Sequence, residues 1–242
     1  MFNKIEASKP VDIIGQEARI DGSLRKYIEE GSFPEVVLSA RKTEVLLGYF
    51  EDLLTKDLFR RFRIRKAALM KSLIKHYFSN ASNLMTFSAA GKALQANPDT
   101  VERFCGYFED VYLFFSLKRF SYKVKEQEKS PRKIYSVDTG LCNSLGFRFS
   151  ENIGRLAENI VFLALKRGQI LEPQTEFFYW KDVMYICDKE NFNMKVISIS
   201  NIFSFFGCFI FSIFVASFIG FYKIFILYID SILRKPDGSV ML

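Results

Sequence analysis

Basic side chains are the residues of this sequence whose number and spacing most clearly indicate a chemistry. They form two clusters, one in the sixteen residues that start at Arg60, where no acidic residue occurs, and one on both sides of Pro131. Closely spaced Lys and Arg residues neutralise phosphate groups, so the clusters indicate an acidic partner such as nucleic acid or an anionic membrane surface, while a solvated basic face is the alternative. The clusters contain Arg60, Arg61, Arg63, Arg65, Lys66, Lys71 and Lys75, and then Lys118, Arg119, Lys123, Lys125, Lys129, Arg132 and Lys133.

Side chains that catalysis or metal binding would need are sparse. The single histidine, His76, lies in a basic segment with no Ser or Cys partner motif, which disfavours a catalytic triad or a histidine-rich metal site. Cys105, Cys142, Cys187 and Cys208 form no CxxC pair, so reduced thiols are expected rather than disulfides or a zinc site. Neither a GxxxxGKS/T loop nor GxGxxG occurs. The sequence therefore predicts no enzyme, no cofactor and no metal.

The 242 residues are enough for one large domain or two small ones. The formal net charge of +7 is carried by the region up to about Lys195, and Phe and Ile dominate the tail that follows. No apolar run or small-residue cleavage site follows Lys4, so a secretory signal is not indicated and the cytoplasm is the expected location.

Apolar residues at helical spacing predict two amphipathic helices, from Leu46 to Leu58 and from Met70 to Tyr77, with the first basic cluster between them. A short helix capped by Ser88 is expected to end at Asn97-Pro98. A longer helix capped by Asp99 or Thr100 follows. Its apolar stripe consists of Val101, Phe104, Cys105, Phe108, Val111 and Tyr112.

A charged hairpin is expected after the longer helix. The stretch YLFFSLKRFSYKVKEQEKSPRKIYSVD predicts an apolar strand, a charged loop that contains Pro131, and a second strand in which Ile134, Ser136 and Asp138 alternate. Helix, turn, helix and charged hairpin together are typical of a winged helix, and a generic helical bundle with one hairpin is the alternative. In the winged helix, Arg103 on the longer helix could face a DNA groove.

The remaining part of the chain up to residue 182 predicts a loop, a helix and a strand. Gly140 to Gly154 reads as a loop, and GRLAENIVFLALKRG as a helix with Leu156, Ile160 and Leu163 facing inward. TEFFYW, rich in residues that favour strands, predicts a strand that ends at Lys181-Asp182. The fold class is therefore α+β and mainly helical.

Several blocks resemble a known family in their order along the chain. They are GSFPEVVL, YFEDLLTKDLFRRF, LMKSLIKHYFSN, TVERFCGYFEDVYLFF, PRKIYSVDTGL, GRLAENIVFLALKRG and FFYWKD, and they extend from about Ser23 to Asp182. Together they resemble the C-terminal half of archaeal and bacterial AAA-type P-loop ATPases whose tail is a domain of unknown function. RKIYSVDTGL and GRLAENIVF are the most specific of them.

The resemblance implies an ATPase half, a winged helix and an end similar to the restriction-endonuclease-like nuclease fold. The ATPase half with its Walker motifs is missing from this sequence, so the resemblance transfers no ATP hydrolysis to it. By this comparison residues 1–40 are a remnant of the ATPase lid, residues 41–138 a winged-helix domain, residues 139–195 a truncated nuclease-like α/β domain and residues 196–242 a hydrophobic tail.

The nuclease-like end departs from the pattern that the resemblance implies. Such folds hold a divalent metal with a helical Glu, an Asp on a hairpin strand and a Glu-x-Lys strand. Glu158 matches the first position, but Met184 stands in place of the Asp, and residues 196–200 supply neither carboxylate nor lysine. Glu158 is therefore expected to be vestigial, and no nuclease activity is predicted.

The tail begins with 27 residues that carry no charge, Val196 to Tyr222. About 20 apolar residues cross a bilayer as a helix, so the length permits a membrane-spanning segment. Two other interpretations stay open, an out-of-frame translation of AT-rich DNA and a buried core helix. A spanning segment would add membrane association to the cytoplasmic location.

The main functional hypothesis is a non-catalytic fragment of an AAA-type ATPase family protein that binds double-stranded DNA through a winged helix. The alternative is a protein-interaction module that docks on an intact ATPase relative, through the apolar GSFPEVVL segment, with an anchor in residues 196–222 as an addition. DNA binding would weaken with salt and protein docking would survive it. The expected DNA contacts are Arg60, Arg61, Arg63, Arg65, Lys66, Arg103, Lys118, Arg119, Lys123, Lys125, Arg132 and Lys133.

Overall fold

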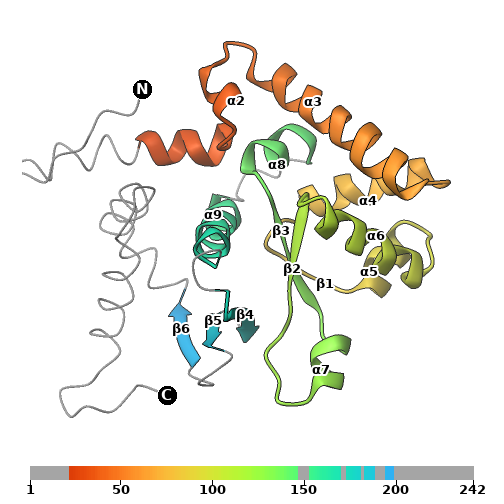
Figure 1. Cartoon of the computed structure of the whole chain (residues 1–242), viewed down its shortest axis with the longest axis vertical. Helices are drawn as coiled ribbons and strands as arrows, with labels where there is room; N and C mark the ends of the chain where they lie inside the picture. The colour runs from red at the N-terminus through yellow and green to blue at the C-terminus, as the bar shows by residue number, and fades with distance from the viewer. Residues whose placement is uncertain (1–21, 147–152, 170–172, 181–182, 189–193, 199–242) are drawn as a thin grey trace, which may run out of the picture. The chain divides into compact units, whose positions relative to one another are not determined.

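The computed structural model describes residues 22–146, 153–169, 173–180, 183–188 and 194–198 (Figure 1). The chain divides into two units, Arg25–Ile199 and a second unit that combines Met1–Leu24 with Ser200–Leu242. Of the second unit only residues 22–24 are described, at the start of a helical segment over residues 22–30. All the labelled helices and strands belong to Arg25–Ile199.

The first labelled helices are α2 (Pro34–Leu38) and α3 (Lys42–Asp52), and a π-helix, η1 (Leu53–Arg60), continues α3. The predicted helix from Leu46 to Leu58 is therefore confirmed. Leu46, Leu54 and Leu58 point into the core, where each is almost fully buried. Their spacing puts them on one side of the helix, and this apolar side packs against the core while the charged side stays in solvent.

Helix α4 (Ala67–Ser79), strand β1 (Leu84–Met85), helix α5 (Phe87–Ala93) and helix α6 (Pro98–Asp110) follow in order. The helices agree with the predicted ones, but their caps differ. The Thr86 hydroxyl accepts a hydrogen bond from the Ala89 amide at 3.0 Å, and the Asn97 side chain accepts one from the Asp99 amide at 2.8 Å. Each helix thus begins about two residues earlier than Ser88 or Asp99 would allow, because an extended residue with a side-chain acceptor precedes it.

The apolar stripe of α6 is confirmed at Val101, Phe104, Cys105 and Phe108, which are buried. Val111 is only partly buried, and Tyr112 is 68% exposed. The helix ends at Asp110, and Tyr112 has a positive φ of 56°, which turns its side chain away from the stripe. The prediction for Tyr112 was therefore wrong because the backbone changes direction at the helix end.

The predicted hairpin is present as β2 (Phe114–Leu117) and β3 (Arg132–Ser136), which pair antiparallel with Phe114 opposite Ser136. β1 joins the other edge of β3, so the sheet order is β1-β3-β2. The connection between β2 and β3 contains a helix, α7 (Val124–Lys129), where a loop was expected. Helix α4 contacts β3 and so does α9 (Ile153–Gly168), and Figure 1 shows them on opposite sides of the strand.

Residues 139–145 form a helix, α8 (Thr139–Leu145), where a loop was predicted. Asp138, expected in the second strand of the hairpin, instead caps α8 by accepting a hydrogen bond from the Leu141 amide at 3.1 Å. The predicted helix that follows is confirmed as α9. Ile160 and Leu163 are buried as expected, and Leu156 is partly buried against the core.

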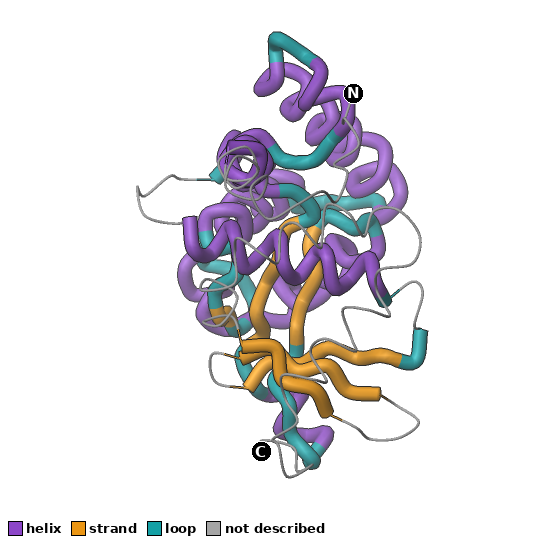
Figure 2. The backbone as a smooth tube through the Cα atoms, turned by 90° about the vertical axis from the view of Figure 1, so that its left-hand side faces the viewer, coloured by secondary structure: helices purple, strands orange, loops and turns teal. Residues whose placement is uncertain are grey.

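The second sheet consists of β4 (Thr175–Trp180), β5 (Val183–Asp188) and β6 (Met194–Ser198), antiparallel in the order β4-β5-β6. The predicted TEFFYW strand is therefore confirmed. Figure 2 shows the two sheets as neighbouring groups of orange strands. Backbone hydrogen bonds join them, because the Phe120 amide donates to the Tyr179 carbonyl at 2.8 Å and the Tyr179 amide donates to the Lys118 carbonyl at 3.0 Å.

The uncharged 27-residue stretch starts inside β6, so its residues 196–198 belong to a strand and not to a spanning helix. The rest of the stretch lies outside the described residues. Among the helices that are described, none has both the length and the apolar character needed to cross a bilayer. The fold of the described residues is α+β and mainly helical, as predicted.

Candidate nucleic-acid interface

The first basic cluster extends from the end of η1 into α4, where Lys71 and Lys75 lie. We call its first part, Arg60–Lys66, the basic linker. Its apolar residues Phe62 and Ile64 pack against the hydrophobic core. Since they alternate with basic residues, they leave the charged side chains in solvent. All five basic residues of the linker are exposed, namely Arg60, Arg61, Arg63, Arg65 and Lys66.

Aromatic contacts hold the basic linker against α6. The Phe62 ring stacks on the Tyr107 ring with centroids 4.1 Å apart, and the Arg61 guanidinium lies 5.3 Å from the centroid of Phe62. None of the five linker charges forms an ion pair within the described part of the chain. The linker therefore presents five positive charges without an acidic partner, and its backbone is held in place by the packing of Phe62 and Ile64.

The second basic cluster surrounds α7, and we call residues 118–133 the wing hairpin. Most of its charges have acidic partners. Glu128 pairs with Lys118 at 2.5 Å and with Arg132 at 3.0 Å, and Glu126 pairs with Lys123 at 3.4 Å. The hydrogen bond from Lys118, and then the charges of Lys118 and Arg132, lower the pKa of Glu128. Arg119, Lys125 and Lys129 are exposed, and no ion pair is found for them among the described residues.

Lys133 does not fit its expected role as a DNA contact. It is buried and pairs with Glu158 at 2.8 Å, in a contact where the two side chains are only 11% and 12% exposed. The Tyr135 hydroxyl donates to the same Glu158 oxygen at 2.7 Å. Burial, and then the Glu158 charge, raise the pKa of Tyr135 well above its usual value. Lys133 thus compensates a buried carboxylate and is not available to a phosphate.

Glu158 itself, the expected vestigial metal ligand, is held by these two donors. Its neighbour Asn159 is fully buried and binds the backbone of Ser136 on both sides, accepting from the amide and donating to the carbonyl at 2.8 Å each. Met184, which replaces the expected Asp, is buried in β5 opposite Ile197. Over the ranges that the structure describes, no group of His, Cys, Asp and Glu side chains could hold a metal ion.

Arg103 is exposed on α6, as expected, but acidic residues surround it on that surface. Asp99, Glu102 and Asp110 are exposed on the same helix. An acidic surface repels phosphate groups, so α6 is electrostatically unsuited to lie deep in a DNA groove. The sequence contains this signal, and a search limited to basic residues misses it.

The two basic segments lie in different parts of the fold. In Figure 1 the basic linker follows the end of α3 and η1, whereas α7 marks the far end of the wing hairpin. The structure therefore separates the expected contacts into an unpaired linker and a largely paired hairpin.

An acidic residue that sequence reasoning missed holds the segment before α2. The Asp138 carboxylate accepts from the Ser32 amide at 2.7 Å as well as from Leu141. Gly31 has a φ of 84°, and a Cβ added there would lie 2.2 Å from an Asp138 oxygen. Burial raises the pKa of Asp138, although the amide donors act in the opposite direction. The sequence suggests a turn glycine at Gly31-Ser32 and a capping aspartate at Asp138, but only the fold shows that the two are in contact.

The described residues thus define a mainly helical α+β protein with two basic surfaces. Residues 21–152 match the family model described as a domain of unknown function, DUF8612, and the chain belongs to this family. It is 30% identical to the uncharacterized protein MJ1544 of Methanocaldococcus jannaschii over 171 residues, which are 67% of this chain and 38% of that protein.

A second relative comes from a bacterium. The chain is 26% identical to an uncharacterized protein of Haemophilus influenzae over 201 residues, which are 76% of this chain and 50% of that protein. The chain therefore spans half or less of the length of these two relatives. No solved structure matches it.

Proposed function

We propose that this chain is a non-catalytic C-terminal portion of an AAA-type ATPase family protein and that it binds the phosphate backbone of double-stranded DNA. The observation that carries the proposal is the basic linker, with five exposed charges and no acidic partner among the described residues. Such a surface gains affinity by releasing counterions from DNA, without reading the base sequence.

The order of the elements supports a winged helix-turn-helix as the scaffold. The elements α4, β1, α5, α6, β2 and β3 follow one another, and the sheet order is β1-β3-β2. In such a scaffold α6 would be the second helix of the motif and residues 118–133 would be the wing. Because α6 is largely acidic on its exposed side, it contributes only Arg103, as a minor contact. The main proposed contacts are the basic linker and the unpaired basic residues of the wing, Arg119, Lys125 and Lys129.

A titration of the full chain with a fluorescent duplex tests the proposal. Three linker substitutions, Arg60→Gln, Arg61→Gln and Arg63→Gln, should together reduce the slope of log affinity against log salt by about 3, since each phosphate contact contributes about 1. The control makes the same change of net charge at three other exposed basic residues, Arg25, Arg41 and Lys56, of which Arg41 and Lys56 pair with Glu44 and Asp52. An unmodified chain that shows no salt-sensitive binding would rule the proposal out.

The second candidate is a protein-interaction module that docks on an intact ATPase relative. The observation that favours it is an exposed apolar surface on α2 and α3, formed by Val37, Leu38, Leu47 and Tyr49, of which Leu38 is 80% exposed. Exposed apolar surface of this kind is typical of an interface between domains. The relatives are two or more times longer than the aligned region, so they contain further chain on which it could dock.

This candidate makes the opposite salt prediction. A complex with a full-length relative should survive high salt, and Leu38→Asp should weaken it while DNA binding stays unchanged. Gel filtration at two salt concentrations measures the complex. A complex that dissociates in high salt, or that is as stable with Leu38→Asp as without it, would contradict the protein-interaction candidate.

A further inference from the structure

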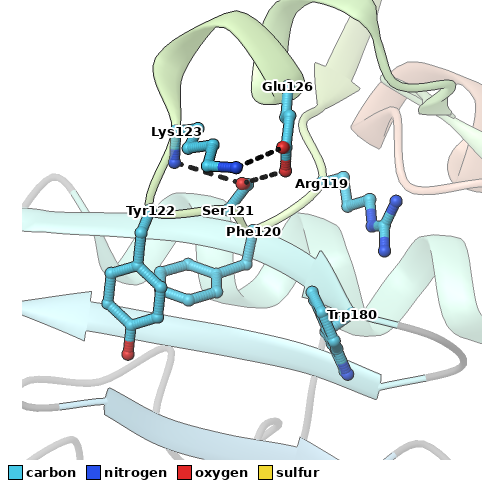
Figure 3. A pocket seen from close by; sticks show the side chains of 7 residues that line it. All are labelled: Arg119, Phe120, Ser121, Tyr122, Lys123, Glu126 and Trp180. Atoms are coloured by element: carbon cyan, nitrogen blue, oxygen red, sulfur yellow. Dashed lines mark hydrogen bonds and ion pairs between the residues drawn. The ribbon is translucent and has the colours of Figure 1, made fainter.

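A cavity of about 430 Å³ lies where the wing hairpin meets β4 (Figure 3). Its walls come from residues 119–123, from Glu126 on α7 and from Trp180 at the end of β4. The volume lies within the range of about 300 to 1,000 Å³ that is usual for ligand pockets. Neither of the proposed functions accounts for it.

One wall of the cavity displays an almost fully exposed aromatic ring. Tyr122 is 92% exposed, and Phe120 packs edge-on against it with ring centroids 5.1 Å apart. Phe120 is in turn packed against Phe178 of β4, with centroids 5.8 Å apart. The sheet therefore supports a tyrosine whose own ring is left open to a planar ligand.

The opposite wall combines a cation with a second aromatic ring. The Arg119 guanidinium lies 4.9 Å from the centroid of the Trp180 ring. Figure 3 shows these two side chains on the side of the cavity away from Tyr122 and Phe120. Arg119 has no acidic partner in the described ranges, so its charge remains available to an anion.

The backbone around the cavity is held in place by hydrogen bonds. The Ser121 hydroxyl accepts from the Lys123 amide at 3.2 Å and donates to Glu126 at 2.9 Å. The Gln127 side chain donates to the Ser121 carbonyl at 2.6 Å. Because the walls are fixed before a ligand arrives, binding would cost little conformational entropy.

We propose that this cavity binds an unpaired nucleotide of a single nucleic-acid strand. Its base would stack on Tyr122, and its phosphate would lie near Arg119. Aromatic rings beside cations are the usual platform for single strands, because every base has a flat face and every linkage carries a negative charge. Glu126 is the only acidic side chain of the lining and is already paired with Lys123.

The inference deepens the proposed nucleic-acid binding and rests on it only in assuming that nucleic acid is the partner. It adds a substrate class: a duplex with an unpaired end or gap would engage both the basic linker and the cavity. A blunt duplex would engage the basic linker and the unpaired basic residues of the wing hairpin through its phosphates, but it would place no base on Tyr122. A binding experiment with both kinds of nucleic acid therefore distinguishes the duplex contacts from the contacts of the cavity.

The experiment titrates the full chain with four labelled oligonucleotides: a blunt duplex, the same duplex with a single-stranded overhang, an oligothymidylate and an oligouridylate. Tyr122→Ala should weaken the single strands and the overhang by about 5- to 150-fold, the range expected for loss of one stacked base. It should leave the blunt duplex within about twofold. Tyr112→Ala, which removes another exposed tyrosine outside the cavity, is the control. The tighter of the two single strands identifies DNA or RNA as the source of the nucleotide.

Trp180 supplies an independent readout because it is the single tryptophan of the sequence. Single-strand binding should quench its fluorescence, and Arg119→Gln should reduce both the quenching and the affinity. If Tyr122→Ala and Arg119→Gln bind single strands like the unmodified chain, the inference is wrong, while salt-sensitive binding of the blunt duplex would leave the proposed function intact. Binding of single strands that depends on Tyr122, without duplex binding, would support the inference and remove the duplex proposal.

Discussion

The basic linker and the wing hairpin have similar composition but opposite electrostatic surroundings. In the linker, apolar residues alternate with five basic residues that form no ion pair among the described residues. In the wing hairpin, three glutamates form ion pairs with four of the seven basic residues, and one of these four, Lys133, is buried. The comparison teaches that a count of basic residues measures the charge of a segment, whereas the acids folded against it decide how much of that charge a ligand can use.

The largest effect should come from breaking the buried pair of the wing hairpin. Glu158→Gln leaves the Lys133 charge buried without its partner, and we expect the free energy of unfolding to fall by about 3 kcal/mol. Glu126→Gln breaks an exposed pair of the same hairpin and should cost less than about 1 kcal/mol. Urea unfolding of both variants measures the difference. Equal effects would show that Lys133 is not the structural member of the cluster.

The next effect sharpens the contrast in DNA binding. Arg60→Gln with Arg61→Gln removes two unpaired charges, and Lys118→Gln with Lys123→Gln removes two paired ones. The linker variant should lower the salt slope of duplex binding by about 2, and the wing variant by clearly less, because its lysines are already neutralised by Glu126 and Glu128. Anisotropy titrations at three salt concentrations give both slopes. The reverse order would contradict the contrast.

A third change should make the wing hairpin resemble the linker. Glu128→Gln releases Lys118 and Arg132 from their shared acidic partner. Duplex affinity in low salt should then rise by about threefold, since more positive charge becomes available to phosphate. Glu44→Gln, which releases Arg41 on α3, is the control and should leave affinity unchanged. A gain in both variants would point to net charge alone.

The smallest effect concerns pH. The pKa of Glu128 is lowered in the folded chain, so its carboxylate stabilises the fold above the usual glutamate pKa, and this contribution is lost as pH falls through the lowered value. Because the pair is exposed, the unfolding temperature of the unmodified chain should lose no more than about 2 °C relative to Glu128→Gln between pH 6 and pH 4. Thermal scans at the two pH values measure this difference. A larger drop in Glu128→Gln would reverse the sign and contradict the pKa direction.

The helices were predictable because their buried positions repeat at helical spacing. Leu54, Leu58, Phe104 and Phe108 are buried as that spacing requires. The caps were less predictable because several neighbouring residues have a side-chain acceptor that can begin a helix, and the sequence alone does not choose between Thr86 and Ser88. Of the second sheet, only β4 was predicted from its own residues, which are rich in types that favour strands.

The candidate site was predictable only at the level of charge. An alternating strand predicts one buried and one exposed face, but β3 contacts both α4 and α9, so Lys133 and Ile134 are both buried. That arrangement joins residues distant in sequence, and no local pattern contains it. The same holds for the cavity, where the ring of Trp180 at the end of β4 lies beside Arg119 from the connection that follows β2. The predicted domain boundaries and the role of the hydrophobic tail remain predictions.

The side chain of Asn159 substitutes for a missing length of strand. β1 pairs with β3 only at Arg132 and Lys133, and the backbone of Ser82 and Asn83 continues the hydrogen bonding to Ile134. The next peptide groups on this edge of β3 are those of Ser136, and no main-chain partner reaches them among the described residues. By accepting from and donating to Ser136, Asn159 closes that edge with a single amide. Ser136 and Asn159 are both fully buried where α9 contacts β3, so this one amide satisfies two peptide groups that no water could reach. Asn159→Asp keeps the size of the side chain but removes its donor, and would leave the Ser136 carbonyl buried without a hydrogen-bond partner and beside a carboxylate.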